Sequence, residues 1–348
     1  MAEVTERTIC LLGFGNVGRR FCELVARKDD ELARRHGLRL RFVAVGTGSH
    51  GSILGPAGLS AAEVLEVADA AAAAGARAGV AVPTPAALFP EPARPGVELA
   101  AASGADVLVE ATPLDPHGGR DAIAHIEAAL SHGADVVTVN KGPIAWDYRR
   151  LADLAAAHGR RLLFEGTVMD GCPVFDLFRS CLPGCRLLGF DAVFNSTTNF
   201  TLAQVQAAGY AEADPSHDID GHDAAAKTAA LANVLMEAAI TPDDVAKDTI
   251  RGVTAERVAA VRAAGRRLRV VCSAGEGGAA SGGRPAQPAV RLTELEPDHP
   301  LYAAGGSTLS VMLHTDLMGT VQVAEHGALP EQTAYAVYAD LLALHEGR

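Results

Sequence analysis

One glycine-rich turn constrains the fold of this chain more than any other feature. An apolar run at residues 9–12 leads directly into a GxGxxG motif, and residues 19–27 follow with helical spacing. In a strand–turn–helix unit, Gly13 allows the tight turn, Gly15 lets the backbone approach a pyrophosphate, and Gly18 lets helix and strand pack closely. The alternative is a purely structural turn. The motif predicts a dinucleotide site built from Gly13, Phe14, Gly15, Asn16, Val17 and Gly18.

Strands and helices alternate through the first half of the chain. Apolar strands are expected at 40–45, 106–110, 135–139 and 161–164, and helices at 63–78, 119–131 and 149–158. This alternation predicts an α/β fold with a Rossmann-type, doubly wound parallel sheet. Ligands of such sheets bind beyond the carboxyl ends of the strands. The residues at those ends, predicted to contact a cofactor, are Thr47, Thr112, Pro113 and Lys141. For Lys141 the alternative is an ordinary surface lysine.

The end of the second strand bears on which cofactor binds. An NAD site usually places Asp or Glu there to hold the ribose 2′-hydroxyl, but residues 47–50 read Thr-Gly-Ser-His. Arg19 and Arg20 lie close to the first turn. The pattern favours NADP, with NAD as the second choice. The alternative is that residues 47–50 form only a polar loop.

A second group of polar residues follows the strand expected at 187–194. Residues 195–199 read Asn-Ser-Thr-Thr-Asn, and such a run is costly to bury unless it binds something. The alternative is the capped start of a helix, with Thr198 or Asn199 as the N-cap. This alternative is a serious one, because Thr and Asn are ordinary capping residues.

Five acids lie close together before and within the start of an alanine-rich helix that is expected to begin near Asp220. Asp223 and Lys227 are spaced i, i+4 on that helix and reach one another. On a surface the pair would contribute only about 0.3–0.5 kcal/mol. Residues 224–232 are almost all Ala and Leu, so we expect a packed helix and a buried lysine, which would serve as a proton donor. The five acids are Glu212, Asp214, Asp218, Asp220 and Asp223.

Five stretches together carry a family resemblance: GFGNVG, VVTVNKGPIA, FEGTVMDGCPVF, FNSTTNF and GYAEADPSHDIDGHDAAAK. The chain resembles the homoserine dehydrogenase family, in its short form without a regulatory domain. The resemblance implies a nucleotide-binding domain at 1–148 and an α+β catalytic and dimerisation domain at 149–324. It further implies that residues 325–348 return to the first domain as a helix, and that the protein is a homodimer.

The resemblance also implies a reaction, the NAD(P)-dependent interconversion of L-homoserine and L-aspartate 4-semialdehyde on the route to threonine and methionine. By match, Lys227 relays the proton, and Lys141 lies between cofactor and substrate. The residues matching the substrate site are Glu212, Asp218, Asp223 and Thr197. The turn matching a Na⁺ or K⁺ site in some family members contains Glu165, Val168 and Asp170.

Three departures from the family pattern keep two alternatives open. Ser196 replaces a glycine, the segment 202–209 is short, and residues 325–329 read Glu-His-Gly-Ala-Leu in place of a glycine-rich turn. One alternative is a paralogue that acts on a different amino-acid aldehyde or oxo acid. The other is a non-catalytic NADP(H)-binding protein.

Composition limits the partners and the location. The 348 residues suit two domains, and 30 basic against 42 acidic residues give a net charge of −12, which disfavours nucleic acid and anionic membranes. Six cysteines without a CxxC pair indicate a reducing cytoplasm, and no apolar run is long enough to span a bilayer. We expect a helix at 173–181, a poorly ordered loop at 273–287, late strands at 289–295 and 309–312, and a final helix at 333–344.

Overall fold

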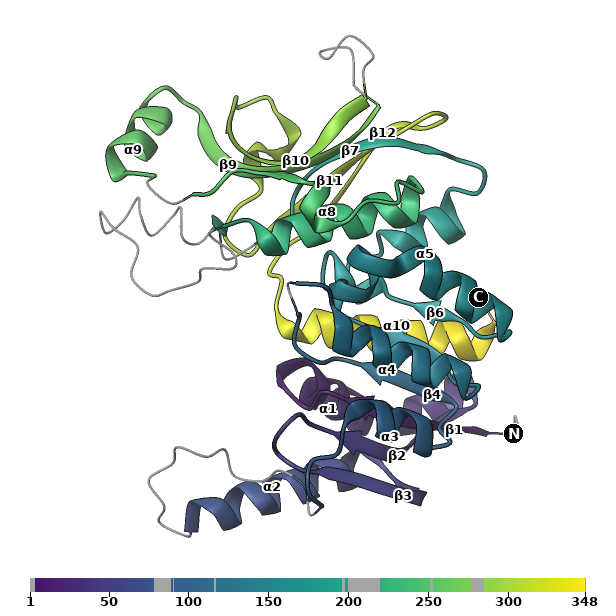
Figure 1. The fold of residues 1–348 in the computed structure, drawn as a ribbon. Coiled ribbons are helices and arrows are strands. Elements are labelled where there is room, and N and C mark those ends of the chain that lie inside the picture. Colours follow the sequence, from purple (N-terminus) through teal and green to yellow (C-terminus); the bar gives the residue numbers. More distant parts are fainter. Residues whose placement is uncertain are drawn as a thin grey trace. The chain divides into compact units, whose positions relative to one another are not determined.

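The computed structural model describes residues 4–77, 89, 91–115, 117–195, 198–199, 220–250, 253–276 and 285–347 (Figure 1). The chain forms two compact units, and three separate segments make up the first: Met1–Pro143, Arg149–Gly171 and Pro330–Arg348. The second contains Ile144–Tyr148 and Cys172–Leu329. These divisions differ from the expected domain limits, since residues 149–171 belong to the first unit and residues 325–329 to the second.

The first unit is built on a six-stranded sheet in the order β3-β2-β1-β4-β5-β6. All neighbouring strands run parallel except β3, which is antiparallel to β2. The predicted doubly wound sheet is therefore confirmed. The strands are β1 (Thr5–Leu12), β2 (Leu38–Gly46), β3 (Ser52–Leu59), β4 (Val107–Glu110), β5 (Asp135–Thr138) and β6 (Leu162–Leu163).

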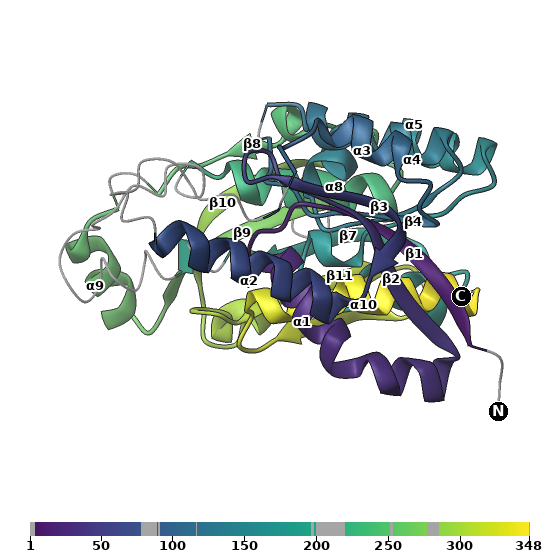
Figure 2. The same ribbon diagram turned by 90° about the horizontal axis from the view of Figure 1, so that it is seen from below.

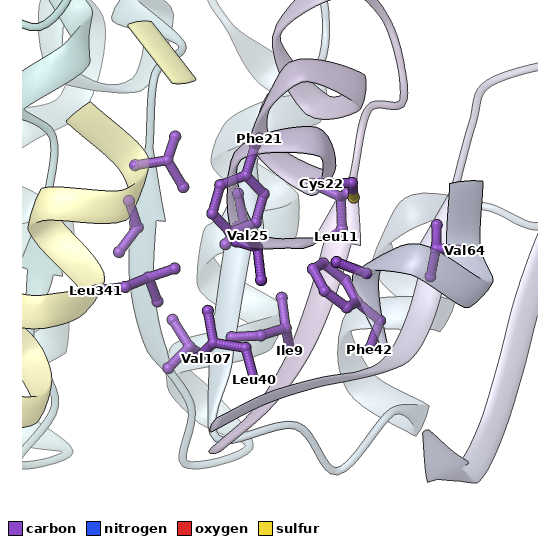
Figure 3. Close-up of a cluster of buried hydrophobic side chains, with 14 of the residues drawn as sticks. Ile9, Leu11, Phe21, Cys22, Val25, Leu40, Phe42, Val64, Val107 and Leu341 are labelled. Carbon is purple, nitrogen blue, oxygen red and sulfur yellow. The ribbon is translucent and has the colours of Figure 1, made fainter. Parts of the chain in front are cut away.

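Helices cover both faces of this sheet, as Figure 2 shows. One face carries α1 (Asn16–Glu31), α2 (Ala61–Arg77) and α10 (Pro330–Glu346), and the returning C-terminal helix is thus part of this core. Phe21 and Val25 of α1 meet Leu341 of α10 above Ile9 of β1 (Figure 3). The other face carries α3 (Gly96–Ala102), α4 (Arg120–Ser131) and residues 149–157 of α5 (Lys141–Ala157).

The second unit is built on another six-stranded sheet, in the order β12-β11-β7-β9-β10-β8. Its neighbours are antiparallel except for the parallel pair of β8 and β10. Helix α8 (His222–Leu235) packs on β9 and β10, and α9 (Ala255–Ala263) precedes β9. The strands are β7 (Leu187–Val193), β8 (Ala246–Lys247), β9 (Arg267–Glu276), β10 (Pro285–Leu295), β11 (Leu309–Thr315) and β12 (Gly319–Glu325).

One expectation about this unit was wrong in part. Strand β9 extends to Glu276 and β10 begins at Pro285, so the two ends of the expected loop at 273–287 are paired strands, while residues 277–284 lie outside the part of the chain that the structure describes. The Ser, Ala and Gly residues of the paired ends carry little strand propensity, and the pairing itself fixes their conformation. The helix expected at 173–181 is present as helical residues 175–181, which end in the π-helical turn η3 (Leu177–Cys181). Across the described ranges, no helix has both the length and the apolar character needed to cross a membrane.

Candidate active site

The glycine-rich turn joins β1 to α1 in the first unit. Gly13 adopts φ +97°, and a Cβ there would lie 2.2 Å from the carbonyl oxygen of Ala111. A Cβ on Gly18 would lie 2.1 Å from the carbonyl oxygen of Gly13, so only glycine permits this approach of helix and turn. At Gly15 no heavy atom lies within 4 Å of the added Cβ. The turn is therefore tight on one side and open at Gly15, where a phosphate group would approach.

The N-terminus of α1 is available to an anion. Gly15 is its N-cap residue, and no side chain caps the first turn. Unpaired N–H groups and the helix dipole at such an end favour phosphate. The side chain of Phe14 points elsewhere, because it is buried edge-on against Phe89 with 5.1 Å between ring centroids. Only the main chain of Phe14 is thus available to a ligand.

Next to this turn lies a pocket of about 650 Å³ within the first unit. It brings together Thr47, Thr112 and Pro113, three residues that were predicted from separate strand ends. Lys141 is not among its lining residues and instead begins α5. The size and the mixture of apolar wall with a few polar groups suit a small-molecule site. The uncapped helix, the open Gly15 and this pocket together fit a dinucleotide.

A buried carboxylate that sequence reasoning missed supports the pocket. Glu110 is fully buried and accepts hydrogen bonds from the main-chain N–H of Thr112 (3.2 Å), from its hydroxyl, and from the hydroxyl of Thr138 (3.2 Å). The imidazole Nδ1 of His125, another lining residue, lies 3.6 Å from the same carboxylate. Asn140 donates to the carbonyl oxygen of Thr112 (3.1 Å). The network fixes the turns after β4 and β5. Its only signal in the sequence is one acid that ends an apolar strand.

The basic residues near the first turn are paired with acids. Arg19 contacts Asp69 at 2.8 Å and Glu23 at 3.1 Å, and the Asp69 carboxylate raises the pKa of Arg19. Arg20 contacts Glu331 at 2.7 Å. Neither arginine is among the lining residues of the pocket, which removes both from the argument for NADP.

Thr47, the residue after β2, and a further arginine both line the pocket. Thr47 uses its hydroxyl within its own turn, donating to the carbonyl oxygen of Gly51 (3.0 Å) and accepting from the N–H of His50 (2.7 Å). The arginine that lines the pocket beside Thr47 and Gly48 is Arg94. Sequence reasoning missed Arg94, because it lies far from β2 along the chain and only the fold brings it there.

The second unit holds the lysine–carboxylate pair. The Lys227 Nζ lies 3.4 Å from Asp223 Oδ2 and donates to the carbonyl oxygen of Phe194 at 2.9 Å. The two side chains are 14% and 16% exposed, so the predicted i, i+4 pair forms and is mostly shielded from solvent. The same Asp223 oxygen accepts from the Asn195 amide at 2.9 Å. An ammonium held by two oxygens, one of them itself hydrogen bonded, is a positioned proton donor.

The polar run after β7 also has a structural role. The Asn195 side-chain oxygen accepts from the N–H of Thr198 (2.7 Å), which makes Asn195 the cap of the short helical segment at 198–199. The N-cap was expected at Thr198 or Asn199, whereas Asn195 takes this role three or four residues earlier in the chain. Asn195 thus joins the cap to Asp223, and both interpretations of the run apply to this one residue.

The candidate cation turn lies in the first unit. Glu165 is buried, and its N–H donates to the Asp340 carboxylate of α10 at 3.0 Å. Asp170 has a left-handed backbone (φ +47°), and its carboxylate accepts from the Thr333 hydroxyl at 2.9 Å. The described residues contain no group of three or more His, Cys, Asp or Glu placed to hold a metal. A monovalent ion here would have to use main-chain carbonyls such as that of Val168.

Several predicted substrate residues lie outside the part of the chain that the structure describes. They are Thr197, Glu212 and Asp218, together with Ser196 and the short segment 202–209.

Comparison with known proteins gives a match for the glycine-rich turn of the first unit and for the lysine–carboxylate pair of the second. Residues 13–165 match the family described as the NAD binding domain of homoserine dehydrogenase, and residues 173–342 match the homoserine dehydrogenase family. The NAD(+)-dependent homoserine dehydrogenase of Pseudomonas canavaninivorans is 33% identical over 99% of this chain and 97% of its own. The homoserine dehydrogenase of Methanocaldococcus jannaschii is 29% identical over 97% of this chain and 98% of its own.

A solved structure extends the likeness to three dimensions. A hyperthermophilic archaeal homoserine dehydrogenase in complex with NADPH superposes with a TM-score of 0.75 at 26% identity, covering 99% of each chain. The family matches cover the nucleotide-binding turn and the lysine–carboxylate helix alike. This chain therefore belongs to the homoserine dehydrogenase family.

Proposed function

We propose that this chain interconverts L-homoserine and L-aspartate 4-semialdehyde with a nicotinamide cofactor, and that Lys227 relays the proton. As a family member the chain is an NAD(P)-dependent oxidoreductase that acts on a CH–OH group. The observation that carries the catalytic assignment is the buried contact of Lys227 with Asp223 and the Phe194 carbonyl.

The proposed division of labour follows from this geometry. The cofactor, when bound, supplies or accepts the hydride. In the reductive direction Lys227 gives a proton from Nζ to the aldehyde oxygen, and in the oxidative direction it takes the proton of the hydroxyl group. Asp223 keeps the ammonium in place, and Asn195 keeps Asp223 in place. Alignment and one proton transfer are the protein's share of such a reaction.

Substrate recognition is assigned to acidic side chains. A substrate with an α-ammonium group is attracted by carboxylates, and Asp223 is one that the second unit buries in part. We assign Glu212, Asp218 and Thr197 to the same site on the family resemblance alone. Lys141 is assigned a place between cofactor and substrate on the same ground.

The choice of nicotinamide cofactor is proposed from the first unit. No carboxylate follows β2 at residues 47–50, and Arg94 lines the pocket there. A guanidinium suits a 2′-phosphate, so we propose a preference for NADP with NAD as a weaker cofactor. The relatives include both an NAD(+)-dependent enzyme and an NADPH complex.

Three further expectations remain predictions: a homodimer, a cytoplasmic location, and a Na⁺ or K⁺ ion at the turn of Glu165, Val168 and Asp170. The cation is tested by turnover rates measured in potassium, sodium and tetramethylammonium chloride at one ionic strength. Equal rates in all three salts would contradict a functional cation at this turn.

The decisive experiment follows the reduced-nicotinamide absorbance of purified protein with L-homoserine and NADP⁺, then NAD⁺, at alkaline pH. Reduction of either cofactor supports the proposed reaction and ranks the two coenzymes. No change in absorbance with homoserine, together with turnover of another amino-acid aldehyde, would replace the proposed reaction by that of a paralogue with a different substrate. NADPH binding with no turnover on any aldehyde would leave only the non-catalytic reading.

A further inference from the structure

The second unit contains a pocket that the lysine–carboxylate pair, Lys227 and Asp223, does not line. Its volume is about 510 Å³, within the range of about 300–1,000 Å³ typical of ligand sites. Its walls come from α9, the start of β9 and the segment around η6 (Pro300–Ala303). The polar lining residues are Asn199, Arg262, Arg266, Arg267, Arg269 and Tyr302.

The charge of this pocket is strongly one-sided. Among its described lining residues, four are arginines and none carries a carboxylate. Arg266 pairs with Glu294 at 2.6 Å and lies 3.9 Å from Glu296. For the other three arginines no ion pair with a described acid exists. In a protein with a net charge of −12, such a concentration of uncompensated positive charge is unusual and attracts anions.

Two buried polar groups in the pocket wall lack partners. Asn199 is 4% exposed, and among the described atoms neither its side-chain oxygen nor its nitrogen has a hydrogen bond. The Nε of Arg269 is also buried without a partner. Leaving a buried donor unsatisfied is costly, so native structures rarely keep one without a ligand or water.

The surroundings hold the Arg269 guanidinium in place. Its other nitrogens donate to the carbonyl oxygens of Leu268 (3.0 Å) and Tyr302 (3.4 Å). A Cβ on Gly305 would lie 2.8 Å from Nη2 of Arg269, so the absence of a side chain at Gly305 leaves room for the guanidinium. Burial, with Arg267 nearby, lowers the pKa of Arg269 to about 10, which an anion would reverse. Arg267 is itself placed over the Tyr302 ring, 4.5 Å from its centroid.

We propose that this pocket binds a small organic anion with at least two negative charges, held through phosphate or carboxylate oxygens. A guanidinium donates two parallel hydrogen bonds to either a phosphate or a carboxylate group, and the Asn199 amide supplies a further donor. The pocket is larger than a bare inorganic ion needs, which leaves space for the rest of a metabolite.

Isothermal titration calorimetry of the full chain with inorganic phosphate and with succinate, at constant ionic strength, tests this proposal. We expect saturable binding of at least one probe, and the tighter probe identifies the anionic group. Arg262→Gln and Arg269→Met should each weaken it about tenfold or more. The matched control is Arg257→Gln, on the same helix but outside the pocket lining. Arg262 is exposed, so its variant keeps the test valid if Arg269→Met fails to fold.

Three results would overturn the proposal. One is no saturable binding of either probe up to about 10 mM, a range that corresponds to negligible affinity. Another is binding that the pocket variants leave unchanged, which would place the anion at the α1 N-terminus instead. The last is a change of oligomeric state in Arg262→Gln without any loss of probe binding, which would make the pocket wall a contact between chains.

Discussion

Lys227 is the residue on which the proposed proton transfer depends. Replacing it by Met keeps most of the buried volume but removes the ammonium held by Asp223 and Phe194. We expect kcat to fall by about 10²–10⁴, the usual contribution of a general acid. The dissociation constant for NADPH, measured by fluorescence titration, should stay unchanged. Lys247→Met, in β8 of the same unit, is the control, and near-normal turnover in Lys227→Met would remove lysine from the mechanism.

Arg94 is the residue that should separate the two coenzymes. It is a half-exposed side chain whose described partner is Glu91, 2.9 Å away, so a phosphate would compete for it easily. We expect Arg94→Gln to raise KM for NADP⁺ about tenfold and to leave KM for NAD⁺ unaltered. Steady-state kinetics with both coenzymes measure this. Arg149→Gln is the control, and an equal rise for both coenzymes would contradict a 2′-phosphate contact.

At the scale of elements, two glycines near the start of α1 have different roles, Gly18 in packing and Gly15 in the proposed phosphate binding. A Cβ on Gly18 meets the backbone of Gly13, whereas one on Gly15 meets nothing within 4 Å. Gly18→Ala should therefore lower Tm by several degrees, since about 1 kcal/mol shifts Tm by about 2–4 °C in a domain of about 150–250 residues. Gly15→Ala should keep Tm but weaken NADPH binding. Calorimetry and a cofactor titration on both variants check the pair, and a reversed pattern would mean that phosphate does not approach Gly15.

Elements with a clear period were predictable, and those defined by pairing were not. The apolar run at 9–12 and the helix around Asp223 and Lys227 could be located from the sequence to within a few residues. Strand β3 (Ser52–Leu59) contains Gly and Pro and shows no alternation, and only its antiparallel contact with β2 makes it a strand. The site followed the same rule. Motif residues, Asn195 among them, were found, while Glu110 and Arg94 were not, because their roles come from contacts between distant segments.

At the scale of the whole molecule, buried thiols report on each unit separately. Cys10 and Cys22 lie in the first unit and Cys272 in the second, and burial raises the pKa of all three. In native protein we expect alkylation at the exposed Cys181 first. Pulse alkylation along a urea gradient, read by mass spectrometry, then gives the unfolding of each unit.

The same labelling locates the cofactor. NADPH at about a hundred times its dissociation constant should stabilise its unit by about 2.7 kcal/mol. With NADPH bound, we expect Cys10 and Cys22 to resist alkylation up to a higher urea concentration than without it. The urea concentration at which Cys272 becomes alkylated should not change. A shift confined to Cys272 would place the nucleotide in the second unit and refute the assignment to the glycine-rich turn.

The discontinuity of the first unit has a consequence for synthesis on the ribosome. Helix α10 covers one face of its sheet, yet the ribosome makes all of Cys172–Leu329 before that helix. Until then the face that Phe21 and Val25 share with Leu341 stays uncovered on the nascent chain. The second unit can thus fold while the first is incomplete. Exposed apolar surface of this kind is what chaperones bind, so newly made chains should need them more than a protein whose domains are each contiguous.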